Sequence, residues 1–411
     1  MPIEILLPQV GAITPEQLAE WATRGETAAP FDPSVLDACA DLSQRIMRDR
    51  EARQYPELLA LGFWIRKAEL HRLREEFLRL ERPDRVLVPR GMVFHLPPRN
   101  VDTMFVYSWL LSALTGNRNV IRLSPLRSES TNVLLRLFSE ALAAAAEPAR
   151  STTLVVSYGH EEEPTAILSA LCDTRVIWGG DQTVAAIRRS PIAPHAREIT
   201  FPDRRSMAAI QAEAYLQLTV EDRAKLADRF FNDSFWFDQL ACSSPRSVVW
   251  CGAPEQAREG SADFFPRVVE SVRQHGLLGA PAHSMRKLVY SAGLVLEAPV
   301  SACRRWPELT VLTLDSAAAL GGEHPGGGLF LETTIESLEE LVPVLGRKDQ
   351  TLATFGFSDD ELRRWVGKLN GRAIDRVVPI GQALQFGRFW DGLDLLLEFC
   401  RQIHLNNAPL R

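Results

Sequence analysis

One cysteine of the chain stands where a nucleophile could act. Cys242 lies in WFDQLACSSPRSVVW (236–250), at the end of a predicted helix and directly before a predicted turn and strand. At such an exposed junction, backbone N–H groups or a helix terminus can activate a thiol, and the acylated thiol is a thioester that hydride can reduce. A small buried core residue is an equally good interpretation of position alone. Cys251, inside the following strand, fits the core role better.

A pair of glycines could bind phosphate groups. In TRVIWGGDQTVAAIRR (174–189), Gly179 and Gly180 follow a predicted strand and open a predicted helix, whose first turn contains Thr183. Free N–H groups at a helix start suit a diphosphate, and open α/β sheets bind ligands at the carboxyl ends of parallel strands. Taken alone, the glycine pair is more typical of a plain tight turn.

An arginine and a serine could hold a ribose. In GNRNVIRLSP (116–125), Arg122 lies at the end of a predicted strand and Ser124 follows it. A guanidinium and a hydroxyl at that edge could bind a ribose and a 2′-phosphate. Taken singly, an exposed strand arginine without a role is the more common case.

An asparagine could stabilise a developing oxyanion. In HLPPRNVDTMF (95–105), Asn100 lies in a loop just before a predicted helix. Its amide could donate a hydrogen bond to the oxyanion, although the local position fits a helix cap better.

The elements that must position these residues alternate along the chain. Helical spacing over 33–82 predicts two helices, and valine-rich residues 85–98 predict a short strand or hairpin. Further strands are predicted at 120–124, 152–159 and 174–180, with helices at 104–115, 130–146, 161–172 and 182–190. This alternation is typical of βαβ units on a parallel sheet.

A second αβ region extends from about 218 to 369. Strands are predicted at 246–252 and 287–291, with a helix at 261–276, and the stretch after 371 returns to a strand and then a helix. With 411 residues the chain exceeds one compact core. We expect an N-terminal helical segment (1–84), a Rossmann-like cofactor domain (85–217), a catalytic domain (218–370) and a C-terminal segment (371–411) that returns to the cofactor domain or an oligomer interface.

Composition narrows the class of protein. The chain is 46% hydrophobic and 24% charged with a net charge of −6 and no long basic block, which argues against a nucleic-acid binder. No apolar run is long enough to span a bilayer, and MPIEILLPQV lacks the features of a signal peptide, so we expect a cytoplasmic protein. The six cysteines form no CxxC pair, and no metal site is predicted.

In type and order, these pieces resemble the aldehyde dehydrogenase superfamily, and most closely its LuxC-like acyl-CoA reductases. The resemblance runs from about residue 60 to 400 and is carried by GFWIRKAEL, PPRNVDTMF, GNRNVIRLSP, VIWGGDQTVAAIRR, DQLACSSPR and RVVPIGQALQFGRFWDGLDLLL. It implies an α/β aldehyde dehydrogenase-like fold, with a Rossmann-like cofactor domain, a smaller α/β catalytic domain and a cleft between them.

The resemblance also implies roles for the candidate residues. Cys242 matches the family's acylated cysteine, and Asn100 matches the asparagine that helps to stabilise the oxyanion. Arg122 stands where the wider superfamily usually has a cofactor-binding lysine, and Gly179 and Gly180 match its phosphate-binding turn. The family's usual cofactor is NADPH, and Arg122 is compatible with its 2′-phosphate, so NADH is the less favoured choice. The implied acyl donor is acyl-CoA or an acyl carrier protein, and the implied assembly is a homo-oligomer.

One departure from the superfamily favours reduction. Oxidising members usually have a glutamate in an LELGG segment, which activates the water that hydrolyses the thioester. In REITFPDRRS (197–206), Thr200 takes that place and the glycine pair is missing, although Glu198 or another carboxylate could still act. Oxidation of an aldehyde is therefore the nearest alternative function, and a cysteine acyltransferase or thioesterase without reduction is a second.

Two histidines and a glycine turn have weaker claims to a role. His195 and His160 lie in predicted loops and could protonate the product, although loop histidines are more often solvated surface groups. HPGGGLFLE (324–332) could approach the nicotinamide, but a flexible turn is the favoured interpretation.

Overall fold

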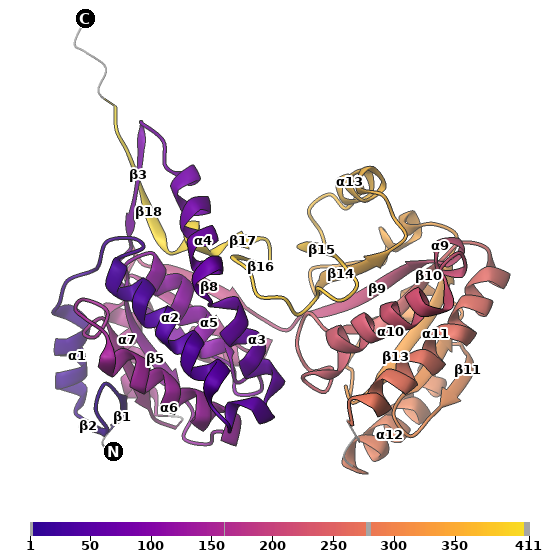
Figure 1. The fold of residues 1–411 in the computed structure, drawn as a ribbon, viewed down its shortest axis with the longest axis horizontal. Helices are drawn as coiled ribbons and strands as arrows, with labels where there is room; N and C mark the ends of the chain where they lie inside the picture. Colours follow the sequence, from indigo (N-terminus) through magenta and orange to yellow (C-terminus); the bar gives the residue numbers. More distant parts are fainter. Residues whose placement is uncertain (1–2, 160, 277–280, 407–411) are drawn as a thin grey trace, which may run out of the picture. The chain divides into compact units, whose positions relative to one another are not determined.

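The chain forms two α/β units, each built on its own sheet (Figure 1). The computed structural model describes residues 3–159, 161–276 and 281–406. Unit 1 contains Met1–Pro202 and Phe386–Arg411, and unit 2 contains Asp203–Gln385. Unit 2 is thus inserted into unit 1 along the sequence.

The sheet of unit 1 is parallel at its centre. Its strands, in spatial order, are β2 (Gly11–Ile13), β1 (Ile3–Leu7), β6 (Thr153–Ser157), β5 (Arg118–Leu123), β4 (Met92–Leu96), β7 (Thr174–Trp178) and β8 (Arg197–Phe201). From β6 to β8 all neighbours are parallel, as the βαβ pattern predicts, while β1 and β2 add an antiparallel edge. Residues of β4, β6 and β7 are buried throughout, because a parallel sheet is covered on both faces.

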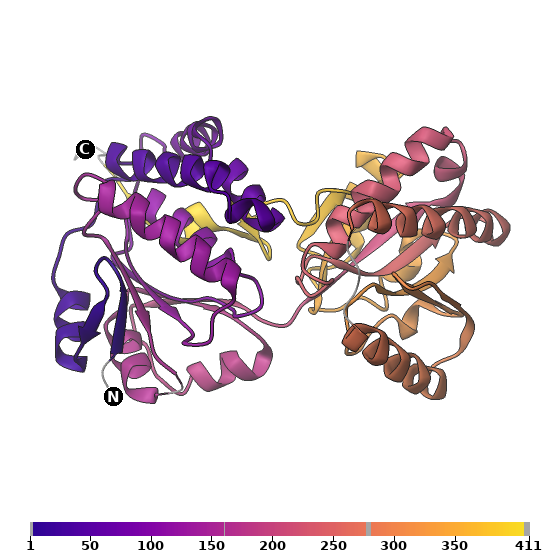
Figure 2. The ribbon, with the colours of Figure 1, turned by 60° about the horizontal axis from the view of Figure 1, so that its bottom comes forward.

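Helices cover both faces of this sheet. The helices of unit 1 are α1 (Pro15–Thr23), α2 (Pro33–Arg48), α3 (Pro56–Trp64), α4 (Lys67–Leu80), α5 (Met104–Leu114), α6 (Glu129–Ala144), α7 (Glu162–Leu171), α8 (Asp181–Ile187) and α14 (Leu395–Glu398), with a 3₁₀ turn η1 (Ala52–Gln54). Helices α2 and α6 pack together on one face, and α1 and α7 pack together on the other (Figure 2). Residues 33–82 form more helices than the predicted two, because Pro56 starts a new helix at its first position.

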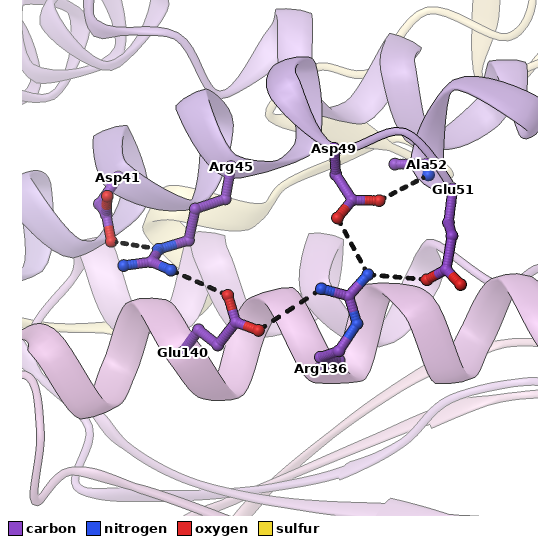
Figure 3. Close-up of polar contacts among 7 residues, drawn as sticks. All are labelled: Asp41, Arg45, Asp49, Glu51, Ala52, Arg136 and Glu140. Atoms are coloured by element: carbon purple, nitrogen blue, oxygen red, sulfur yellow. Dashed lines mark hydrogen bonds and ion pairs between the residues drawn. The ribbon is translucent and has the colours of Figure 1, made fainter.

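A network of charges joins α2, η1 and α6 at the surface (Figure 3). Arg45 bonds Glu140 across the two helices at 2.9 Å, and Arg136 bonds Asp49 at 3.0 Å. The network also includes Asp41, Glu51 and the backbone N–H of Ala52, which donates to Asp49. Exposed pairs of this kind each contribute at most about 1 kcal/mol, so the network fixes the register of the helices more than it adds stability.

The sheet of unit 2 is also mainly parallel. Its strands, in spatial order, are β11 (Val300–Arg305), β12 (Thr310–Leu314), β13 (Leu329–Ile335), β10 (Pro245–Cys251), β9 (Arg205–Gln211), β14 (Asp349–Phe355) and β15 (Arg376–Pro379). Only the β11–β12 pair is antiparallel among these described strands. Because β9 pairs with β10 on one side and β14 on the other, the chain passes into unit 2 at Asp203, ahead of the expected start at 218.

Two apolar clusters fill the faces of the unit 2 sheet. The helices are α9 (Ala212–Leu216), α10 (Val220–Phe235), α11 (Pro254–Gln274), α12 (Pro281–Glu297) and α13 (Asp359–Lys368), with 3₁₀ turns η2 (Ala317–Ala319) and η3 (Leu338–Leu341). One cluster joins α10 and α11 to the sheet through Phe230, Phe264 and Trp250. The other joins α13 to the opposite face through Trp365 and Leu352.

The expected strand at 287–291 is wrong, because these residues lie inside α12. Local strand propensity favoured KLVYS, but the longer segment has apolar residues at helical spacing. The apolar side chains Met285, Leu288, Val289 and Leu296 are exposed, whereas Lys287 is buried.

The expected C-terminal helix is also largely wrong. Helix α14 has only four residues, and β18 (Cys400–His404) follows it and pairs antiparallel with β3 (Arg85–Pro89). Two short strands, β16 (Phe389–Trp390) and β17 (Leu393–Asp394), precede α14. Strand β3 therefore forms no hairpin with β4, and the C-terminal segment completes unit 1. Tyr107 Oη donates to Gly387 O at 2.7 Å and fastens this segment to α5.

Candidate functional site

A cavity of about 470 Å³ opens at the carboxyl edge of the unit 1 sheet. We call it the unit 1 pocket. It is lined by the ends of β4, β5 and β7 and by the loops that follow them, and it contains every candidate residue predicted for this unit: Asn100, Arg122, Ser124, Gly179, Gly180 and Thr183. Its size falls within the range of about 300–1,000 Å³ that is typical of small-ligand sites. The structure therefore brings these six residues together around one cavity, and their roles stay predictions.

The glycine turn of the pocket is tightly packed. A Cβ atom added to Gly179 would lie 3.1 Å from Thr183 Cγ2, which is tighter than an ordinary contact. Gly180 is the N-cap residue of α8, and no side chain caps the free N–H groups there. Next to the turn, Trp178 stacks on Phe201 with ring centroids 3.7 Å apart. The Gly179 N–H donates to Phe201 O at 3.1 Å, so the backbone that is left for a ligand is the first turn of α8.

Arg122 lies in the pocket wall, but its guanidinium is partly engaged. Its Nη2 donates to the carbonyls of Tyr158, at 2.8 Å, and Gly159. Burial lowers the pKa of Arg122, while Tyr158 and Glu161 raise it. Ser124 Oγ accepts from the Leu126 N–H at 3.2 Å, which folds the loop after β5 over the pocket.

The sequence interpretation missed two cations and one carboxylate of the pocket. Arg99 and Arg127 also line it. Arg127 Nη1 donates to Ser124 O and Ser157 Oγ, both at 3.2 Å, and so lies between the ends of β5 and β6. Asp102 accepts from the hydroxyls of Ser130 and Thr131, the latter at 2.8 Å. Arg99 and Asp102 stand beside Asn100 in HLPPRNVDTMF, but their relation to the other pocket residues arises only where separate loops meet.

Asn100 is exposed at the mouth of the unit 1 pocket. The helix-cap interpretation of this residue is wrong, because the N-cap of α5 is Thr103. Its amide is therefore available to a ligand.

The loop that carries Cys242 lies at the amino edge of the unit 2 sheet, between α10 and β10. We call residues 236–244 the Cys242 loop. Asp238 and Gln239 have positive φ angles of 50° and 63°, a conformation that is uncommon for residues other than glycine. The buried Gln239 amide donates to Pro245 O at 2.9 Å and to Leu329 O at 2.7 Å. The tertiary structure thus holds a conformation that the local sequence does not favour.

Three consecutive glycines form a turn that is hydrogen-bonded to the Cys242 loop. Gly326, Gly327 and Gly328 all have positive φ angles, between 64° and 76°. The Gly327 N–H donates to Asp238 O at 2.8 Å, and the Gly328 N–H donates to Gln239 Oε1 at 3.1 Å. The glycines of HPGGGLFLE therefore form a turn, as predicted, while its residues 329–332 begin β13, and the turn holds the Cys242 loop by these two hydrogen bonds.

Cys242 contacts residues from two neighbouring strands. Ser206 Oγ on β9 donates to Cys242 O at 2.7 Å, and Gln350 Nε2 on β14 donates to Cys242 Sγ at 3.3 Å. Ser206 Oγ in turn accepts from the Thr351 N–H at 3.2 Å. Cys242 is partly exposed, as its predicted junction required, and not a core residue.

Arg246 places a positive charge near this thiol. Burial lowers its pKa, the charge of Cys242 raises it, and Arg205 lowers it further. The same guanidinium acts on His324, whose pKa is lowered to about 3 mainly by burial. Arg246 and His324 line one small cavity together with Tyr290. Asp203 also acts on Arg246, and Glu323 lines the same cavity, so Arg246 shares this side with carboxylates.

The other cysteines differ from Cys242. Burial raises the pKa of Cys172, Cys251 and Cys400 to about 12 and that of Cys39 still further. A buried neutral thiol of this kind is inert. Cys303, on the edge strand β11, is exposed.

The residues considered for hydrolysis or proton transfer lie elsewhere. Glu198 is bonded by Arg175 at 3.0 Å and by Arg188 at 2.7 Å. Burial raises the pKa of Glu198, but these two guanidinium groups outweigh it and lower the pKa overall. Thr200 lies within β8, opposite Ile177. His195 is exposed in a loop of unit 1, and His160 lies outside the described residues.

The described residues contain neither a candidate membrane span nor a candidate metal site. No helix among them is long and apolar enough to cross a membrane. No cluster of three or more His, Cys, Asp or Glu side chains within 3–159, 161–276 and 281–406 could hold a metal ion.

Sequence comparison matches residues 70–262, which include Cys242, to the family described as acyl-CoA reductase (LuxC). The chain is 28% identical over 167 residues to a long-chain acyl-protein thioester reductase of Aliivibrio fischeri, covering 40% of this chain and 33% of that protein. It is 21% identical over 299 residues to the enzyme of the same name from Vibrio harveyi, covering 71% and 59%. The chain thus spans between a third and three fifths of these relatives. The resemblance to LuxC-like acyl-CoA reductases is confirmed.

Solved structures establish the fold. A putative aldehyde dehydrogenase from Burkholderia cenocepacia matches with a TM-score of 0.64 and 15% identity, covering 98% of this chain and 95% of that one. HpcC from Thermus thermophilus matches with a TM-score of 0.64 and 16% identity, covering 98% and 89%. A 1-pyrroline-5-carboxylate dehydrogenase from Thermus, solved with bound NAD, matches equally well over 95% and 84%. The chain has the aldehyde dehydrogenase fold, as the sequence predicted.

Proposed function

We propose that the protein is an acyl thioester reductase that converts an acyl-CoA or an acyl-protein thioester to an aldehyde, with NADPH as the reductant and Cys242 as the acylated nucleophile. The observation that carries the proposal is the setting of Cys242. It is a partly exposed thiol bonded by Gln350 and close to the guanidinium of Arg246. The family match across this residue supports the same conclusion.

The proposed reaction has two steps. The Cys242 thiolate attacks the acyl carbon, and the bond from that carbon to the donor sulfur breaks, so that the donor leaves as a thiol after taking one proton. Hydride then adds to the acyl carbon, the bond to Cys242 Sγ breaks, and the aldehyde leaves. One acyl thioester, one hydride and one proton give one aldehyde and one thiol. Asn100 and a backbone N–H near Cys242 are the proposed donors to the oxyanion.

The unit 1 pocket has the chemistry of a dinucleotide site. Among its described lining residues, Arg99, Arg122 and Arg127 face one carboxylate, Asp102, which already accepts two hydroxyl hydrogen bonds. Such a balance favours a polyanion. A nicotinamide dinucleotide bound there would supply the hydride. Gly179, Gly180 and Thr183 would hold its diphosphate, and Arg122 with Ser124 would hold the adenosine ribose and its 2′-phosphate.

The fate of the thioester separates the proposal from its alternatives. Glu198 is occupied by two arginines and Thr200 cannot act as a base, so neither supplies the water-activating carboxylate of an oxidising enzyme. This supports reduction over hydrolysis. The names of the Aliivibrio and Vibrio relatives favour an acyl-protein donor. We also expect a cytoplasmic homo-oligomer, which light scattering on the purified protein would test.

Intact-mass spectrometry tests the proposal directly. The protein is incubated with a panel of acyl-CoA and acyl-protein thioesters, and NADPH oxidation and aldehyde formation are followed in parallel. We expect acylation of Cys242 and thioester-dependent NADPH oxidation, with loss of both in Cys242→Ala. The matched control is Cys303→Ala, which removes the exposed cysteine of β11 and should change neither.

Three results would contradict the proposal. Retention of acylation and reduction in Cys242→Ala would exclude Cys242 as the nucleophile. Acyl transfer or hydrolysis without binding of a nicotinamide would indicate the acyltransferase or thioesterase. A faster rate with NADP and aldehyde than with NADPH and acyl thioester would indicate the oxidative direction.

A further inference from the structure

The strands beside Cys242 depart from regular pairing at the same level of the sheet. Between β9 and β10, Pro245 pairs with Ser206 and Ser247 pairs with Met207, so Arg246 is an extra residue in the ladder. Bulges of this kind redirect a side chain and are common next to active sites.

A second irregularity lies on the other side of β9. Asp349 pairs with Arg205 and Leu352 pairs with Met207, so β14 advances three residues while β9 advances two. The shift falls on Gln350 and Thr351. Ser206, between the two irregularities, holds Cys242 O through its hydroxyl. Ser206, Arg246 and Gln350 are therefore the second residues of three adjacent strands, at the edge of the sheet that carries the Cys242 loop.

Arg246 has no hydrogen bond or ion pair with any described residue, and its buried Nε has no partner. Arg246 is half-buried as a residue, but its Nε is shielded from solvent, and a buried polar nitrogen is normally hydrogen-bonded. Its neighbours on β9 and β14 illustrate the contrast, since Arg205 bonds Asp349 at 2.6 Å. An unpaired guanidinium destabilises the folded protein, and an anion that forms nearby during the reaction would offset this loss of free energy.

We propose that Arg246 and Gln350 are positioning residues that hold Cys242 as the thiolate, Arg246 through its charge and Gln350 through its amide N–H. Asp203 raises the pKa of Arg246 without forming an ion pair with it, and the thiolate would be a second anion near the guanidinium. The amide reaches Sγ directly at 3.3 Å, whereas the guanidinium acts through its charge, which interacts with the charge of Cys242. This inference rests on the proposed function, because a thiolate is needed only if Cys242 is the acylated nucleophile. The reactivity of the thiol can nevertheless be measured without any substrate.

Other ionisable groups face Arg246, and their titration must be distinguished from the effect of Arg246 on Cys242. They are Asp203 and Arg205 before and on β9, Tyr290 on α12 and His324 before β13. Burial raises the pKa of Tyr290 and lowers that of His324 to about 3. Both therefore stay neutral from about pH 5 to pH 9, so a change of Cys242 reactivity in this range does not arise from their titration.

The test is the pH dependence of alkylation by iodoacetamide, followed for each cysteine by peptide mass spectrometry. In Arg246→Met, we expect the midpoint for Cys242 to rise by about one pH unit or more, with about tenfold slower alkylation at neutral pH, because only the thiolate reacts. Arg246→Lys should restore most of the rate. Gln350→Met should raise the midpoint less, since it removes a hydrogen bond and leaves the charge.

Controls separate this effect from unfolding. Arg363→Met removes an exposed arginine of α13 and should leave Cys242 alkylation unchanged. Alkylation of the exposed Cys303 in the same sample is the internal reference and should keep its rate in every variant. If Arg246→Met does not fold, Arg246→Gln, which retains polar contacts without the charge, carries the same expectation.

An unchanged midpoint in folded Arg246→Met or Arg246→Gln would overturn the inference for the charge, and an unchanged midpoint in Gln350→Met would overturn it for the amide. Failure of the proposed function is a different result. In that case, wild-type Cys242 would be alkylated readily, with the Arg246 dependence intact, but would not be acylated by any thioester.

Discussion

The two units place their candidate sites at opposite edges of their sheets. In unit 1, the pocket lies at the carboxyl edge and is built from the loops that follow β4, β5 and β7. In unit 2, Cys242 precedes β10 and lies at the amino edge, with Ser206 and Gln350 from the starts of β9 and β14. The first arrangement is general for open α/β sheets, whereas the second is not.

This difference explains which residues could be found from the sequence. Each carboxyl-edge loop continues from its strand, so a short motif such as the one around Gly179 contains both the strand and the ligand-binding turn. The amino-edge site joins the first residues of strands that are distant in sequence. Gln350 lies 108 residues from Cys242. No sequence motif contains both residues. The predictions below test whether the unit 1 pocket and the Cys242 site depend on separate parts of the structure.

The largest effect is expected from the glycine turn below the Cys242 loop. Gly328 has a φ of +76°, and an added Cβ would lie 2.7 Å from Glu308 O. Gly328→Ala should destabilise unit 2 by about 3 kcal/mol, because strain and a backbone clash add. Chemical denaturation would measure this, and nicotinamide binding by unit 1 should not change. Gly346→Ala, in open space in unit 2, is the control; an equal loss there would remove the special role of the turn.

Arg127 tests the cofactor preference. Its guanidinium bridges Ser124 O and Ser157 Oγ at the pocket wall, where a 2′-phosphate would add a stronger acceptor. Arg127→Met should weaken NADPH binding by about 2 kcal/mol, or thirtyfold, and leave NADH binding nearly unchanged. Titration of both cofactors by fluorescence gives the ratio. Equal losses for NADPH and NADH would assign Arg127 to the shared part of the dinucleotide.

Gly179 tests the backbone turn itself. Gly179→Ala should weaken both NADPH and NADH by about 1 kcal/mol, or fivefold, because Thr183 must move by a few tenths of an ångström. Cys242 alkylation should stay at the wild-type rate, since it depends on unit 2. Gly387→Ala, whose Cβ meets nothing within 4 Å, is the matched control in unit 1. Loss of Cys242 reactivity in Gly179→Ala would contradict the independence of the two sites.

The smallest effect concerns pH and unit 1. His95 is fully buried between Ser108 and Asn119, and burial lowers its pKa from 6.5 to about 4. A histidine with a lowered folded pKa stabilises the fold above its unfolded pKa, and this contribution is lost as the pH falls toward 4. From pH 7 to pH 6 the expected loss is about 0.7 kcal/mol. Hydrogen exchange of β4 and β5 at the two pH values measures it, and an increase in protection at pH 6 would contradict the assignment.

The fold was predictable where short motifs, or the alternation of strands and helices along the chain, determine it. The parallel strands of unit 1 and the junction before β10 follow directly from the sequence pattern. The strand at 287–291 failed because the local propensity of KLVYS conflicted with the helical spacing of the longer segment, and β18 failed because its partner β3 lies more than 300 residues away. Arg127 and Arg246 were missed because each acquires its surroundings only from other parts of the fold.

The pairing of β18 with β3 also bears on how the chain folds as it is made. Ribosomes release residues in order, so the whole of 203–385 emerges before Cys400–His404 exists. Unit 2 can complete its sheet during synthesis. Strand β3 keeps an unpaired edge until Cys400–His404 have been synthesised. An unpaired strand edge invites pairing with other chains. The late return of the C-terminal segment therefore makes unit 1, which depends on both ends of the chain, the more vulnerable unit during folding.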